Sequence, residues 1–141
     1  GEMTLLYGRP TGFVAEQWQS HWLARRARAA PLPGAGNDAL RCDRLGCIVK
    51  FDEGRTVAVS LDRQALSEDC RTAALVIAPL FAVKNCAAMV VDRNDLRRRG
   101  AHALWLTDAG IRIETVADSV GRRPWMGLAE QPAMRRPAGV Q

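Results

Sequence analysis

Four cysteines are the residues of this chain whose type and spacing point most directly to chemistry. Cys42 and Cys47 lie in the stretch RCDRLGC, and Cys70 and Cys86 follow later in the chain. Structural zinc usually takes thiolates in pairs with about two to four residues between them. Cys42 and Cys47 come close to that spacing, but Cys70 and Cys86 are separated by a predicted helix end, a strand and a loop. A four-thiolate zinc site is therefore weakly supported, and a Cys-x-x-Cys redox motif is absent.

Disulfides fit the same spacing better. The loop from Cys42 to Cys47 can close locally around Gly46, and Cys70 and Cys86 bracket an expected strand from either end. We favour two disulfides, with zinc binding and four inert buried thiols as the alternatives. Bridges persist in oxidising compartments, so this interpretation predicts a protein that works outside the cytoplasm.

The remaining polar residues match no motif of catalysis or cofactor binding. The chain has two histidines, His21 and His102, and no paired-histidine motif, so it cannot build a hydrolytic two-metal site by itself. A nucleophile elbow, a phosphate loop and a dinucleotide fingerprint are absent, and no cofactor is predicted. We expect helix capping or solvated charge for the carboxylates Asp62, Glu68, Asp69, Asp92 and Asp95.

Arginine supplies most of the positive charge. The formal net charge is +5, and Lys50 and Lys84 are the only lysines. Guanidinium groups bind phosphates in a two-pronged geometry, so this balance is compatible with nucleic-acid binding, although a GC-rich genome also enriches arginine. The candidate DNA-contacting residues are Arg97, Arg98, Arg99, Arg122, Arg123 and Trp125. The alternative for these clusters is a solvated turn, with the indole anchoring the end of the domain.

The elements that would position these residues alternate between extended and helical patterns. The pattern predicts a strand at 3–7, then a helix from Val14 whose last turns carry Arg25, Arg26 and Arg28, and a Pro/Gly linker at 31–37. The expected elements after the linker are a hairpin of strands 47–51 and 56–61, a short helix at 63–70, buried strands at 74–78 and 88–91, a helical turn at 95–99 and strands at 101–106 and 111–116.

Together these elements predict an α/β fold, with a mixed β-sheet of about six strands and flanking helices. We expect one domain over residues 1–125 and a disordered tail over 126–141, where proline, alanine, glycine and arginine follow no period. The longest apolar run, at 73–83, contains a proline and is too short to cross a bilayer. The first residues lack an initiator methionine, so we expect a piece of a longer protein.

Four segments of the chain resemble the carboxy-terminal end of the ComEC family of competence proteins, in its alphaproteobacterial branch. They read RCDRLGCIVKF, RTVAVSLDRQALSEDC, CAAMVVDRNDLRRRGAHALWL and IRIETVADSVGRRPW. The family comprises inner-membrane channels that carry single-stranded DNA into the cell during natural transformation. The resemblance implies a periplasmic domain similar to the second half of a metallo-β-lactamase-like fold, and a family activity proposed to be that of a metal-dependent nuclease.

The chain departs from the metal-binding members of that fold at two positions. Where they have a Thr-Gly-Asp-like turn, this chain has Val59-Ser60-Leu61-Asp62, so Asp62 is the only residue that matches a ligand position. Where they have a Pro-His-His-Gly-like turn, this chain has Pro79-Leu80-Phe81-Ala82, without a histidine. We therefore expect Asp62 to be a turn residue and the half-domain to have no metal site or catalytic residue of its own.

Three functional hypotheses follow. The first is a periplasmic domain of a DNA-uptake channel that guides or scaffolds incoming DNA, with DNA and the rest of the parent membrane protein as partners and no small-molecule substrate. The second is the carboxy-terminal half of a nuclease whose metal ligands lie upstream. The third is a purely structural domain of the channel.

Overall fold

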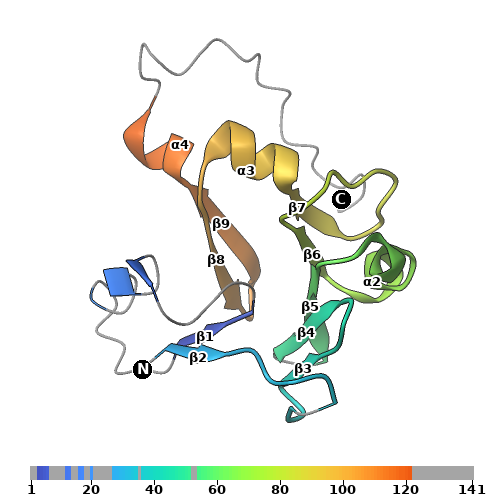
Figure 1. The fold of residues 1–141 in the computed structure, drawn as a ribbon. Helices are drawn as coiled ribbons and strands as arrows, with labels where there is room; N and C mark the ends of the chain where they lie inside the picture. Colours follow the sequence, from blue (N-terminus) through green and yellow to red (C-terminus); the bar gives the residue numbers. More distant parts are fainter. Residues whose placement is uncertain are drawn as a thin grey trace.

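A five-stranded mixed sheet forms the centre of the fold in the computed structural model (Figure 1). The structure describes residues 3–6, 12–13, 16–17, 20, 27–34, 36–51 and 54–121. The sheet contains, in spatial order, β3 (Leu40–Cys42), β4 (Gly46–Phe51), β5 (Arg55–Ser60), β6 (Leu75–Ala78) and β7 (Met89–Asp92). The pairs β3–β4 and β4–β5 are antiparallel, whereas β5, β6 and β7 run parallel.

Two small sheets and four short helices complete the described part. Parallel strands β1 (Met3–Leu5) and β2 (Ala27–Ala29) form one small sheet, and antiparallel strands β8 (His102–Thr107) and β9 (Gly110–Thr115) form the other. The helices are the 3-10 helix η1 (Arg63–Ala65), α2 (Leu66–Thr72), α3 (Arg93–Arg99) and α4 (Val116–Val120). Within the described ranges, none of these helices has the length and apolar composition that a membrane crossing requires.

Alternation along β5 and β6 places apolar side chains on both faces of the central sheet. Ala58 and Val76 face α2, whose Leu66 and Cys70 pack against them. Val57, Leu75 and Val91 face the opposite side, where α3 and the β8–β9 hairpin cover them. Figure 1 shows this layering, with α2 on the outer side of the sheet and the hairpin across from β5 and β6. Burial on both faces explains why residues 75–78 are apolar at every position.

Apolar and charged residues alternate along β9, and this alternation determines which face of the β8–β9 hairpin packs on the core. Ile111 and Ile113 contact the central core, and Arg112 and Glu114 point to solvent, where they form an ion pair of 2.6 Å. The guanidinium of Arg112 also lies 4.1 Å from the ring centroid of Trp105 on β8. The inward and outward positions predicted from sequence for this strand are confirmed.

The α/β class is confirmed, together with the expected hairpin, the buried strand at 74–78 and the short helices. The expectation that Arg28 belongs to a helix end is wrong, because Ala27–Ala29 form β2 and pair in register with Met3–Leu5. Two short elements, β3 and α4, were not predicted. Most of the helix expected from Val14 and the whole tail at 126–141 lie outside the described residues.

Candidate nucleic-acid interface

All four cysteines are disulfide-bonded. Cys42 and Cys47 are opposite residues in the β3–β4 register, with their Cα atoms 4.0 Å apart. Cys70 near the end of α2 pairs with Cys86 in the loop before β7, with a Cα separation of 5.0 Å. The disulfide interpretation is confirmed, and zinc ligation or free buried thiols are excluded for these residues. The two bridges indicate an oxidising, extracytoplasmic compartment.

Asp62 is a capping residue. It lies at the start of η1, and its Oδ1 accepts a hydrogen bond of 2.9 Å from the backbone N–H of Gln64. Over the described residues, no group of three or more histidine, cysteine, aspartate or glutamate side chains lies close enough together to hold a metal ion. The geometry gives Asp62 a local structural role in the turn after β5.

Asp69 was grouped with the solvated and capping carboxylates, and the structure corrects this. It lies on α2 with its side chain turned toward β5, where Oδ2 accepts a hydrogen bond of 2.6 Å from the hydroxyl of fully buried Ser60. Burial raises the pKa of Asp69, and the Ser60 hydrogen bond acts in the opposite direction. The sequence carries no signal for this pair, because its two members are nine positions apart in different elements.

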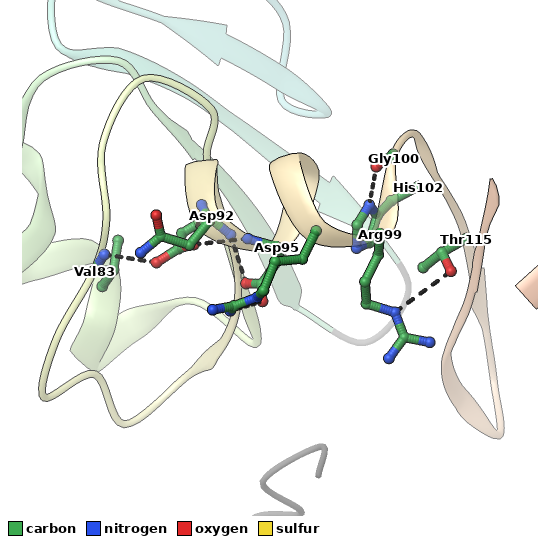
Figure 2. A network of polar contacts seen from close by, with 9 residues as sticks. Val83, Asp92, Asp95, Arg99, Gly100, His102 and Thr115 are labelled. Atoms are coloured by element: carbon green, nitrogen blue, oxygen red, sulfur yellow. Dashed lines mark hydrogen bonds and ion pairs between the residues drawn. The ribbon is translucent and has the colours of Figure 1, made fainter. Parts of the chain in front are cut away.

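A network of backbone and side-chain hydrogen bonds fixes the amino-terminal end of α3 (Figure 2). Asp92 Oδ1 accepts from the N–H groups of Asn94 and Asp95, and Asp95 accepts from the N–H of Asp92, so the pair forms a reciprocal capping box. The second oxygen of Asp92 accepts from the N–H of Val83, which ties the preceding loop to the helix. Asp92 is one of the carboxylates for which helix capping or solvated charge was expected, and the structure shows that it caps α3.

The three arginines at the end of α3 have different surroundings. Arg99 spans from α3 to α4, with a bond of 2.6 Å to Asp118 Oδ1 and one of 3.4 Å to Thr115 Oγ1. Arg98 is exposed and pairs with Asp95 within the same helix at 3.2 Å. Arg97 is exposed, and its guanidinium has no ion-pair or hydrogen-bond partner among the described residues. Arg97 therefore offers its charge to a ligand, Arg98 is paired within its own helix, and Arg99 joins two helices.

One further arginine on this helix was missed by sequence reasoning. Arg93 is exposed, and its guanidinium also lacks a partner in the described part of the chain. It lies four residues before Arg97, and residues at this spacing share one face of a helix. The sequence RNDLRRR shows this four-residue spacing between its first and second arginines, so the shared helix face of Arg93 and Arg97 could have been predicted.

Asp118 is the carboxylate that receives Arg99. Hydrogen bonding from the Thr115 hydroxyl lowers the pKa of Asp118, and the charge of Arg99 adds to this effect. Thr115 and Asp118 also form the capping box that begins α4. The carboxylate is consequently held ionised where α3 and α4 meet.

The remaining residues singled out from the sequence are His102, Arg122, Arg123 and Trp125. His102 is half-buried, and its Nδ1 lies 2.8 Å from the carbonyl oxygen of Gly100. Arg122, Arg123 and Trp125 lie outside the described residues.

Comparisons of the chain with family models, curated proteins and solved structures found no match. The interpretation of the site consequently rests on the geometry of these residues.

Proposed function

We propose that this chain is a periplasmic domain of an inner-membrane DNA-uptake channel, and that it guides or scaffolds DNA without a catalytic site of its own. The observation that carries the proposal is the exposed arginine face of α3, on which Arg93 and Arg97 have no carboxylate partner among the described residues. Unpaired guanidinium groups on a rigid helix are suited to phosphate oxygens, because each presents several donors in a fixed plane.

Four further observations support this proposal. The net charge of +5 favours association with a polyanion. The two disulfides fit a periplasmic location, because the periplasm is an oxidising compartment. The segments that resemble the ComEC family include α3 and both of its flanking strands. Asp62, the residue at a family ligand position, is engaged as a cap, which favours guidance of DNA over cleavage.

The test is a binding titration with fluorescein-labelled oligothymidylate over a series of salt concentrations. Phosphate contacts predict an affinity that falls with salt, with a log–log slope of about −0.7 for each contact to a single strand. The double variant Arg93→Ala/Arg97→Ala is expected to reduce the magnitude of that slope by about 1.4. The matched control is Arg71→Ala/Lys50→Ala, which removes the same charge from exposed positions elsewhere.

Two results would contradict the proposal. The first is the absence of salt-dependent binding by the wild-type chain. The second is hydrolysis of the oligonucleotide with stoichiometric manganese or zinc, because a catalytic metal would then be present and the nuclease hypothesis would take its place.

A further inference from the structure

The carboxyl ends of the three parallel strands bring basic residues together at one edge of the central sheet. β5 is followed by η1 with Arg63, β6 by a turn with Phe81, and β7 by α3 with Arg93. Because the strands are parallel and adjacent in the order β5-β6-β7, these three segments emerge at the same edge. In open sheets of this kind, ligands commonly bind outside the carboxyl ends of the strands.

Phe81 connects the two arginines. The guanidinium carbon of Arg63 lies 4.9 Å from the centroid of the Phe81 ring, within the range of a cation–π contact. The carbonyl oxygen of Phe81 accepts a hydrogen bond of 3.3 Å from the backbone N–H of Arg93. Phe81 itself is buried, and both arginine side chains are exposed. Phe81 thus contacts the guanidinium of Arg63 with its ring and the backbone of Arg93 with its carbonyl group.

The carboxylates nearest to these arginines are already occupied by backbone donors. Asp62 precedes Arg63 and caps η1, and Asp92 precedes Arg93 and accepts three N–H groups with its two oxygens. Asp92 is also buried. Neither arginine forms an ion pair in the described part of the chain. The positive charge at this edge is therefore available to a ligand.

The loop that carries Phe81 is held at two points after this residue. The bridge from Cys86 to Cys70 fastens it to α2, and the N–H of Val83 donates to Asp92 at the start of α3. Between these two points lies Lys84, which is exposed and adds a further cation. Side chains on a fixed loop lose less conformational entropy on binding, which favours a preformed site.

We propose that Arg63 and Arg93, both in contact with Phe81, form a phosphate-contacting site for the backbone of single-stranded nucleic acid. The site rests on the proposed DNA-guiding function and identifies where the strand is held. Arg97 lies on the same face of α3, four residues or about 6 Å along the helix axis from Arg93. A strand that contacts the Arg63–Arg93 site therefore continues along the cationic face of α3.

The experiment compares Arg63→Ala/Arg93→Ala with the charge-matched control Arg71→Ala/Lys50→Ala. Arg71 lies at the end of α2 and Lys50 near the end of β4, at the opposite edge of the sheet. The test variant is expected to bind labelled oligothymidylate more weakly and to lose about 1.4 from the magnitude of the salt slope. Over a fourfold increase in salt, that change corresponds to about a sevenfold smaller loss of affinity. Equal binding by the test and control variants would overturn the site and leave the DNA-guiding function in place.

A second measurement separates failure of the site from failure of the proposed function. Inorganic pyrophosphate is titrated into the ¹⁵N-labelled wild-type chain, and the amide resonances of Phe81 and Arg93 are followed. If oligothymidylate does not bind but pyrophosphate shifts these resonances in the wild type and not in the variant, the phosphate site stands and DNA guidance fails. The absence of any shift, together with the absence of DNA binding, overturns both.

Folding of the variants is checked by cooperative urea unfolding. If the alanine variant does not unfold cooperatively, Arg63→Gln/Arg93→Gln replaces it, because glutamine keeps most of the aliphatic stem of arginine on Phe81 and removes the charge. The glutamine variant is expected to show the same loss of affinity and salt slope, and wild-type binding by it would overturn the site.

Discussion

Replacement of Ser60 by alanine tests the buried contact between β5 and α2. The Ser60 side chain is fully buried, and its hydroxyl donates to Asp69 Oδ2 at 2.6 Å. The substitution removes the hydroxyl donor, so the buried Asp69 Oδ2 loses this hydrogen bond. Because a hydrogen bond to a charged group contributes about 1.5–3 kcal/mol, Ser60→Ala is expected to lower the free energy of unfolding by that amount at neutral pH.

The loss of unfolding free energy in Ser60→Ala should depend on pH. The direction of this dependence follows from the pKa of Asp69. Burial raises this pKa above its ordinary value of 3.8, so the contribution of Asp69 to stability is present below that value and is lost as the pH rises through the folded-state pKa. Removal of the Ser60 hydroxyl takes away an interaction that lowers the pKa. The loss caused by Ser60→Ala is therefore largest at neutral pH and falls toward about 1 kcal/mol, the contribution of a neutral hydrogen bond, when Asp69 is protonated.

The assay is urea unfolding followed by tryptophan fluorescence, with the disulfides intact, at neutral pH and at about pH 4. Ser67→Ala, at an exposed position on α2, is the control and should change the free energy of unfolding by less than about 0.5 kcal/mol. Asp69→Asn keeps an acceptor for the hydroxyl and removes the charge, so it should be more stable than the wild type at neutral pH. An equal effect of Ser60→Ala at both pH values would refute this account of the pair.

Three other substitutions test the supports of the fold by the same unfolding assay. Cys70→Ala/Cys86→Ala opens a loop with a sequence separation of 16, and chain entropy predicts a loss of about 3 kcal/mol; a loss below about 1 kcal/mol would contradict this. Asp118→Asn should flatten the acid limb of the stability curve, because hydrogen bonding from Thr115 lowers the pKa of Asp118 and its contribution is lost as the pH falls through that pKa; an unchanged limb would count against it. Gly46→Ala should lower the free energy of unfolding by about 1–3 kcal/mol, because the added Cβ would overlap a backbone carbonyl oxygen of β5. Wild-type stability of this variant would contradict the prediction and show that β4 can shift away from β5 to make room for the methyl group.

Predictions from sequence were most accurate where the determining interactions are local. Asp92 caps α3 through N–H groups two and three residues away, and Gly100 ends the helix with a positive φ of 75°. The alternation in β9 follows from a strand with one face on the core. The local bridge between Cys42 and Cys47 was also predicted from its spacing.

The elements missed by sequence reasoning are short. Residues 116–120 form α4 after the capping box of Thr115 and Asp118, a spacing that is visible in the sequence but was assigned to the end of a strand. β3 has only three residues, and it is strand-like because it pairs with β4. β2 was assigned to a helix, because its pairing partner, β1, is more than twenty residues earlier in the chain.

The sequence by itself determined the α/β class, the disulfide chemistry, the basic charge and the helix that carries it, because each depends on composition or on neighbours within a few residues. Only the tertiary structure decided how that charge is distributed. It pairs Arg99 with Asp118 on another helix, buries Asp69 against Ser60, and places Arg63 beside Phe81 and Arg93 at one edge of the sheet. The physical reason is that parallel strand pairing brings together chain segments tens of residues apart, and local sequence does not encode which side chains then meet.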